Sequence, residues 1–400
     1  MSVRSQVLPA IAALLSLVLF AVSANIVFAS LVRVSGTFGI APEYLATVSA
    51  VQFAGFFASS LAGGFAADLV GKRRVLQCGC GLVTTGGMIW AFAPAAWVVF
   101  VGGWVMGMGG GILEAISSAL LTDLYPRRRK LVMNLSQVAY CGGAVSGPAL
   151  MGWLLPLGIS WRWFFGATAF GAAILFVLYE ASSVSRCEAN GPPSRDSGWG
   201  GVWGLTVALA APCIVIFLYV FAEMGTATFM TLYLQDILQA PERWAIGSLS
   251  IFWAMMIIGR LVCAFLPEHH AYEWVIAFLM VLAGCAALCQ VWVVAWPLSV
   301  VLFATSGLAF AGTWPLIISM VAMRHSTRSG AAVGVTVAAG SVGCIAAPAV
   351  ISPLFASGHA SLMFAVAAGA LFVGGALVLL CPFLHTRFRV CEEAIDDEAD

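Results

Sequence analysis

The stretch that decides the fold of this chain joins two apolar segments and reads Gly64-Phe65-Ala66-Ala67-Asp68-Leu69-Val70-Gly71-Lys72-Arg73-Arg74. Gly64 permits close contact between helices, and Asp68, near a helix end, can pair with a cation or with a helix N-terminus. Gly71 supplies a tight turn, and Lys72 and Arg73 hold the loop in the cytoplasm. If the loop only fixed the orientation in the membrane, the basic residues would be enough, and Gly64, Asp68 and Gly71 would have no role. The complete pattern therefore predicts a conformational latch that closes the inner side of a membrane protein and breaks when the protein moves.

This stretch is one part of a longer repeat, because the chain matches itself at an offset of 200 residues. The matching pairs are Gly64–Asp68 with Ala264–Glu268, Gly143–Pro148 with Gly343–Pro348, Gly107 with Gly307, and Arg128 with Arg328. All of them keep one register and lie at corresponding ends of apolar segments. Two like halves in a membrane protein suggest a central site that opens to either side when one half rocks on the other.

Composition excludes an ordinary soluble domain. The 400 residues are 62% hydrophobic and 9% charged, whereas soluble domains carry roughly 25% charged residues. Twelve apolar stretches lie between the charged clusters, each close to the roughly 20 residues with which a helix crosses a bilayer. They are 8–33, 43–66, 75–93, 97–122, 131–155, 162–181, 204–234, 244–266, 273–292, 296–323, 330–356 and 360–384. The sequence predicts an all-α integral membrane protein with twelve transmembrane helices in two six-helix bundles.

The longest polar interruption divides these stretches into six and six. It runs from Ser182 to Gly201, contains Gly, Pro and Ser, and has no apolar period, which is typical of a flexible linker. We therefore expect an N-terminal bundle at 1–181, a cytoplasmic linker at 182–203, a C-terminal bundle at 204–384 and an acidic cytoplasmic tail at 385–400. Such a tail is usually solvated.

The distribution of basic residues predicts the orientation. With the N-terminus in the cytoplasm, fifteen of the 18 Lys and Arg residues, Arg260 among them, fall on the inner side. The outer side then holds only Arg33, Arg162 and Arg243. This positive-inside bias predicts a multi-pass protein of the cell inner (plasma) membrane with both termini cytoplasmic.

Two carboxylates lie at membrane depth, where an ionisable residue is expensive and is a functional candidate by default. Glu114 is well inside the stretch 97–122, and Glu223 is deep in 204–234. Neither has a Lys or Arg on its own expected helix within a turn or two. A desolvated carboxylate without a cation favours its protonated form, so it can bind and release a proton. We predict that both couple transport to protons. The alternative is a permanently protonated Glu that only hydrogen-bonds a neighbouring helix.

Further polar side chains accompany these carboxylates inside the apolar stretches. They are Asn25, Gln52, Asn134, Gln137, Tyr140, Tyr219 and Trp314. Amide, hydroxyl and carboxyl groups beside an indole can hydrogen-bond the hydroxyls of a polyol and stack on the C–H face of a sugar. With Glu114 and Glu223 they form the predicted substrate-binding set. For Asn25, Gln52 and Tyr140, packing between helices is the alternative interpretation.

Twelve spans in two repeats, with the loop at Gly64–Arg74, resemble the major facilitator superfamily. Its motif A reads glycine, three residues, aspartate, two residues, glycine and a basic pair. In that fold the first, fourth, seventh and tenth helices line a central cavity. The resemblance therefore implies a cavity lined by the helices that carry Asn25, Glu114, Glu223 and Trp314.

Within that superfamily, Gly107–Ala115 followed by Asn134-Leu135-Ser136-Gln137 is similar to the fucose permease branch. The resemblance implies sugar–proton symport, with Glu114 in coupling and sugar contact and Gln137 in sugar contact. The chain departs from the branch at two positions. Asn25 stands where an acidic residue is common, and Ser118 replaces an asparagine four residues after the glutamate. These departures argue against fucose itself as the substrate.

A second resemblance keeps an alternative open. Gly143, Gly147, Pro148 and Gly152 resemble part of the antiporter signature of drug–proton exchangers, although Met151 replaces a glycine. The arginine that those exchangers carry early in the fourth helix is missing. Efflux antiport, facilitated or sodium-linked transport and, as a different class, a non-transporting receptor on the same fold are therefore the alternatives.

The sequence contains no set of residues typical of an enzyme. We find no Ser/His/Asp set, metal cluster or phosphate loop, and we expect neither a cofactor nor a metal. The expected partners are a small polar solute (a sugar), protons and the lipid bilayer. We expect no nucleic acid to bind, and we expect the protein to work as a monomer.

Overall fold

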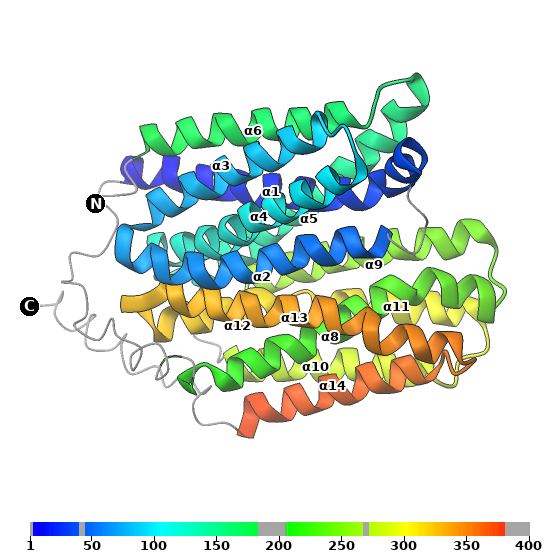
Figure 1. Cartoon of the computed structure of the whole chain (residues 1–400). Coiled ribbons are helices and arrows are strands. Elements are labelled where there is room, and N and C mark those ends of the chain that lie inside the picture. The colour runs from blue at the N-terminus through cyan, green and yellow to red at the C-terminus, as the bar shows by residue number, and fades with distance from the viewer. Residues whose placement is uncertain (1–2, 40–44, 183–204, 206, 267–271, 381–400) are drawn as a thin grey trace, which may run out of the picture.

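The computed structural model describes residues 3–39, 45–182, 205, 207–266 and 272–380, and in these residues it is helical without a strand. Figure 1 shows the helices lying roughly side by side, with α1 to α6 in one part of the molecule and α8 to α14 in the other. The apolar stretches of the sequence become the long helices because a chain in lipid must satisfy its backbone hydrogen bonds within itself.

The first part consists of six long helices and one short turn. They are α1 (Val3–Phe38), α2 (Leu45–Val70), α3 (Lys72–Ala91), α4 (Ala96–Leu124), α5 (Arg129–Leu154), η2 (Leu155–Leu157) and α6 (Arg162–Ala181). The second part consists of α8 (Ala210–Leu232), η4 (Tyr233–Ile237), α9 (Glu242–Ala264), α10 (Tyr272–Gln290), α11 (Trp296–Phe310), α12 (Thr313–Arg324), η5 (Ser326–Arg328), α13 (Ser329–Ala356) and α14 (Leu362–Leu380).

These helices follow the twelve predicted stretches within a few residues at most ends. Ten segments of the described chain are long and apolar enough to cross a membrane, with α11 and α12 together forming one of them. α3 and α5 are not among the ten. α3 begins with three basic residues, and α5 carries several polar side chains in its first turns. Both pack against other long helices, α3 on α4 and α6, and α5 on α1 and α9.

The helix pairs of the two parts repeat each other. α2 packs on α4 as α9 packs on α11, α1 on α5 as α8 on α13, and α3 on α6 as α10 on α14. Gly107 of α4 touches the carbonyl of Gln52, and Gly307 of α11 touches that of Phe252, again 200 residues apart. A side chain at either glycine would meet backbone. The predicted linker at 182–203 and tail at 385–400 lie almost wholly outside the described residues, so the domain boundaries stay a prediction.

One predicted span, 296–323, is interrupted in the structure. α11 ends at Phe310 and α12 begins at Thr313. Pro315 accounts for the interruption, because proline has no N–H to donate to the carbonyl four residues earlier, which is that of Ala311. The freed carbonyl of Ala311 accepts a hydrogen bond from Arg260 Nε at 3.4 Å instead. Pro315 thus produces both the break and a free carbonyl that binds Arg260 inside the molecule.

Candidate functional site

A cavity of about 110 Å³ lies between the two parts of the molecule, and its walls are mostly apolar. It is built by side chains from α1, α2, α4, α5, α8, α9, α12 and α13. The lining residues are Phe20, Phe53, Phe56, Glu114, Gln137, Tyr140, Tyr219, Val220, Glu223, Met224, Trp253, Arg260, Trp314, Gly340, Ser341 and Cys344. Charged and amide groups therefore face one another across aromatic walls.

Glu114 reaches the cavity from the middle of α4 and is 3% exposed. Its Oε1 accepts a hydrogen bond of 3.1 Å from Gln137 Nε2 on α5. Its Oε2 has no hydrogen-bond partner among the described residues. The indole of Trp314 interacts with this carboxylate, yet its Nε1 has no well-formed hydrogen bond in the described chain. The cavity thus contains an unused acceptor and an unused donor close together.

Glu223 reaches the same cavity from α8 and is 6% exposed. Tyr219 lies one helical turn before it, and the Tyr219 hydroxyl donates to the carbonyl of Phe310 at 3.0 Å. Phe310 is the last residue of α11, so the break between α11 and α12 supplies this acceptor as well. The two carboxylates come from different parts of the molecule, as the repeat predicts for a shared central site.

Arg260 is the cavity residue that sequence reasoning missed. We counted it among the cytoplasmic charges because it lies near the end of an apolar stretch. The structure instead buries it at 4% exposure in the cavity wall. Its Nη1 donates to the carbonyl of Gln137 at 2.9 Å and also contacts Cys141 Sγ. Glu114 and Glu223 have no cation on their own helices, but Arg260 of α9 interacts electrostatically with both.

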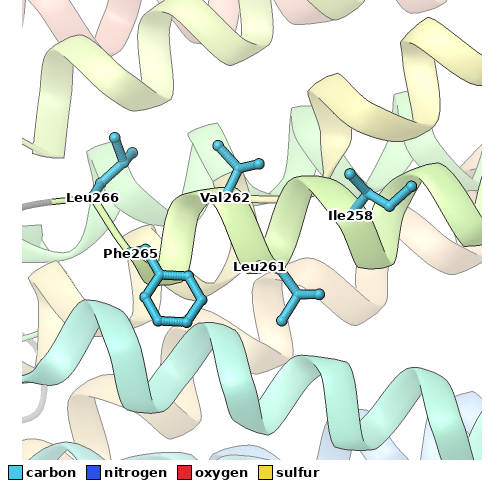
Figure 2. A pocket seen from close by; sticks show the side chains of 5 residues that line it. All are labelled: Ile258, Leu261, Val262, Phe265 and Leu266. Atoms are coloured by element: carbon cyan, nitrogen blue, oxygen red, sulfur yellow. The ribbon is translucent and has the colours of Figure 1, made fainter.

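The periodicity of α9 is the signal that could have found Arg260. Ile258, Leu261, Val262 and Phe265 recur at helical spacing and are all exposed, and Figure 2 shows them with Leu266 lining a shallow apolar pocket. In a membrane protein such a face meets lipid. Arg260 lies on the opposite side of the helix, with the buried Phe252, Met256 and Cys263. It therefore has to point inward.

The structure brings together six of the nine predicted substrate-binding residues. They are Glu114, Gln137, Tyr140, Tyr219, Glu223 and Trp314. Three others do not line this cavity. Asn25 and Asn134 donate to carbonyls of their own helices, those of Ala21 and Lys130, each at 2.8 Å.

Gln52 also lies outside the cavity lining. It is buried on α2, and its Oε1 has no partner among the described residues. Within the described chain no group of three or more His, Cys, Asp or Glu side chains is placed to hold a metal ion.

The predicted latch residues lie where α2 meets α13. Asp68 accepts hydrogen bonds from the backbone N–H groups of Gly330 and Ala331 at 3.0 and 2.8 Å. These are among the first residues of α13, whose N-terminus favours a negative charge. Gly64 lies against the backbone of Gly330 and Gly334, so the two helices touch without side chains between them. The loop thus joins the two parts of the molecule.

The other loop residues act within the first part. Gly71 adopts φ 92°, a conformation that side chains rarely take, and this makes the turn between α2 and α3. Lys72 Nζ pairs with Asp123 at 3.0 Å, and Asp123 also accepts from Ser329 Oγ at 2.9 Å. Arg73 pairs with Glu180 at 2.8 Å. Asp68 and Asp123 thus both bond to the start of α13 in the second part.

The family sequence model described as Major Facilitator Superfamily matches residues 12–348. The chain therefore belongs to the Major Facilitator Superfamily of membrane transporters. This confirms the resemblance inferred from the loop at Gly64–Arg74, together with the all-α membrane fold. Members of this family are transporters rather than enzymes, and the chain is a multi-pass membrane protein.

Two sequence relatives match segments of about a quarter to a third of the chain. A segment of 103 residues is 36% identical to Multidrug resistance protein B homolog of Mycobacterium tuberculosis (strain CDC 1551 / Oshkosh) and covers 26% of this chain and 19% of that protein. A segment of 137 residues is 28% identical to Inositol transporter 4 of Arabidopsis thaliana and covers 33% of this chain and 23% of that protein. The matched segments thus span less than a quarter of either relative's length.

Solved structures match over nearly the whole chain. The proton:xylose symporter XylE, bound to 6-bromo-6-deoxy-D-glucose, superposes with a TM-score of 0.78 at 13% identity and covers 95% of this chain and 96% of its own. FucP in the outward conformation has a TM-score of 0.75 at 15% identity, covering 94% and 99%. At these identities the likeness establishes the fold alone.

Proposed function

We propose that this transporter moves a small polar solute of the sugar class together with protons, by alternating access. The observation that carries the proposal is the pair of buried carboxylates in one cavity, with Gln137 donating to Glu114 and Tyr219 beside Glu223. Carboxylates in a low-dielectric site can exchange protons, and the amide, phenol and indole groups around them suit hydroxyls.

The proposed cycle uses two contacts between the halves, the cavity and the latch at Asp68. With the latch closed, Glu114 and Glu223 bind protons and the solute enters from the opposite end. Rocking of one half on the other then breaks the Asp68 contact with α13 and opens the latch end, where solute and protons leave. The positive-inside bias supports an inner (plasma) membrane location with the latch end and both termini in the cytoplasm.

Proton-coupled efflux of drugs or metabolites is the second candidate. The aromatic walls of the cavity, with Phe20, Phe53, Phe56 and Trp253, favour it, and one relative is named a multidrug resistance protein. The cavity size argues the other way. At about 110 Å³ it is small beside the ~300–1,000 Å³ of pockets for drug-sized ligands.

The direction of coupling separates the two candidates. Purified protein in liposomes is given a panel of labelled sugars and a fluorescent cationic drug, under a pH gradient that is acidic outside and then under its reverse. Symport predicts that a sugar accumulates inside only when the outside is acidic, and that a proton ionophore abolishes the accumulation. Drug movement against the proton flow, with no sugar uptake, would replace symport by antiport.

A further inference from the structure

Arg260 is held in the cavity by neutral acceptors. Two carbonyls, those of Gln137 and Ala311, accept from Nη1 and Nε, and the Cys141 thiol contacts Nη1. None of these groups cancels a positive charge. An arginine stays protonated in proteins, and a buried charge without a counter-charge is costly. A cation kept at this depth needs an anion for at least part of the transport cycle.

The break between α11 and α12 fixes the direction of the guanidinium. Pro315 frees the carbonyl of Ala311, which binds Nε, while α5 binds Nη1 from the other half of the molecule. Nη2 has no hydrogen bond to any described residue. Because the guanidinium is planar and its donors point in fixed directions, the two N–H groups of Nη2 are left to donate to a carboxylate.

The two carboxylates of the cavity do not neutralise this cation by direct pairing. Glu114 and Glu223 both interact electrostatically with Arg260 and line the same cavity, yet in the described chain neither forms an ion pair with it. The space between the cation and the two carboxylates is the cavity itself. A solute with one acidic and several hydroxyl groups would complement all of these partners together.

Proton binding and anion binding are then linked. The other titratable groups around Arg260 are Tyr140 and Cys141 of α5, Tyr219 of α8 and Cys263 of α9, and Cys344 of α13 lies near Glu223. All are neutral in their protonated forms. When Glu114 and Glu223 also hold protons, Arg260 is the one remaining charge that faces the cavity. When they are ionised, they compete with an incoming anion for it.

We propose that the solute is a sugar acid, with its carboxylate on Arg260 and its hydroxyls on Glu114, Gln137 and Trp314. The assignment rests on the proposed function of sugar–proton symport. Protonation of Glu114 and Glu223 removes the competing negative charges, so the anion and the protons load together. Trp314 Nε1 and Glu114 Oε2, which have no hydrogen-bond partner in the described chain, bind hydroxyls of the same solute.

The test compares D-glucuronate with D-glucose, which differ at one carbon. Labelled uptake is measured in liposomes that contain the wild type, Arg260→Gln or Arg260→Lys, with the outside acidic. A hydrogen-bonded charge pair predicts that wild type prefers glucuronate by about tenfold or more. Arg260→Gln should lose this preference by a similar factor. Arg260→Lys keeps the charge without the planar fork and should retain part of it.

A binding measurement keeps the test independent of coupling. A ligand that binds the folded state raises the midpoint temperature of unfolding. D-glucuronate should raise it for the wild type, most at acidic pH, and D-glucose should raise it less. Arg260→Gln should show no shift with D-glucuronate. If that variant does not fold, the comparison of the two solutes on the wild type still decides whether the site prefers an anion.

The outcomes separate this inference from the proposed function. Proton-driven uptake of glucose at least as fast as that of glucuronate would overturn the sugar-acid assignment and leave sugar symport standing. Binding of glucuronate that depends on Arg260, with uptake that does not respond to a pH gradient, would support the anion site and overturn proton coupling. Absence of binding and uptake for both solutes would overturn both proposals.

Discussion

At the scale of single residues, Glu114 is the group whose ionisation the proposed coupling uses. Glu114→Gln keeps the size of the side chain and an oxygen that Gln137 can bond, but it cannot ionise. We expect gradient-driven accumulation of substrate to fall by roughly tenfold or more, a loss of at least ~1.4 kcal/mol. Exchange of solute without a gradient should persist in part, because it needs no net proton movement. Both are measured in liposomes with labelled substrate.

Asp236→Asn is the matched control, because Asp236 is an exposed carboxylate in η4 and does not line the cavity. It should leave accumulation and exchange unchanged. A Glu114→Gln protein that still concentrates substrate against its gradient would show that another group couples transport, with Glu223 the next candidate.

Polarity inside an apolar stretch was enough to predict Glu114, Gln137 and Glu223 as cavity residues. It could not separate them from Asn25 and Asn134, because a short amide can satisfy itself on its own helix, as both do here. The side of a helix on which a residue lies decides between the two cases. That depends on lateral packing, which the local sequence does not specify.

At the scale of elements, the break between α11 and α12 positions two cavity groups, Arg260 and Tyr219, through the carbonyls of Ala311 and Phe310. Pro315→Ala restores an N–H that can bond the Ala311 carbonyl and continue the helix. Proline costs roughly 3 kcal/mol in a helix interior, so the variant should fold at least as stably as the wild type. We expect uptake to fall nonetheless, by about threefold or more, because Arg260 loses a fixed partner.

The control for this variant is Pro353→Ala in α13, where the proline is exposed and far from the cavity. Uptake rates and midpoint temperatures are compared for both proteins. Unchanged uptake by Pro315→Ala would mean that Arg260 keeps its position without the freed carbonyl, and the break would then be a packing feature only.

The latch is a contact between two helices, α2 and α13. Asp68→Asn removes the charge and leaves one good acceptor for two N–H groups. Hydrogen bonds to charged groups are worth ~1.5–3 kcal/mol each, so the closed latch should lose stability and the population should shift toward the state open at that end. Transport should slow with little change in substrate affinity.

The shift can be read by thiol labelling at Ser60→Cys, a position buried on α2 beside Gly334. Mass spectrometry of the labelled peptide keeps the native cysteines from interfering. Labelling should be faster in Asp68→Asn and unchanged in Asp236→Asn. Equal labelling and equal transport rates in all three proteins would leave the loop as a topological anchor.

The helices themselves could be predicted well, because hydropathy along the chain reports directly which segments can lie in lipid. The position of Arg260 could not be predicted by the same rule. A basic residue near the end of an apolar stretch usually anchors the helix at the interface, and only the exposed face of Ile258, Leu261 and Val262 reveals that it points inward. The sequence shows Pro315 but not the hydrogen bond that its break permits, since the donor, Arg260, comes from a helix distant in sequence.

At the scale of the whole molecule, hydrogen bonds join the two halves at the latch end and at the cavity. In the described chain, side-chain hydrogen bonds cross from residues 3–182 to 207–380 at Asp68, Asp123, Arg129 and Arg260. Lys130 also lies over the ring of Tyr272 at 4.4 Å. These contacts hold the latch end closed in this structure, and in the proposed cycle the repeated helix pairs let the other end close in its turn.

The repeat leads to a prediction about assembly. If each half packs as its own bundle, co-expressed fragments 1–190 and 191–400 should reassemble and retain measurable uptake. The cut falls outside the described residues and leaves every contact named above intact. A tether raises the effective concentration of one half near the other, so cutting it should lower the yield of assembled protein more than the rate per assembled molecule.

Each fragment alone is the control. Glu114 and Gln137 come from the first fragment, and Glu223, Arg260 and Trp314 come from the second, so neither should transport or bind D-glucuronate by itself. Uptake is normalised to the amount of complex that is recovered through an affinity tag on one fragment. Uptake by residues 1–190 alone would mean that the cavity is not shared between the halves, because half of the groups assigned to the solute and all contacts of Arg260 would then be dispensable.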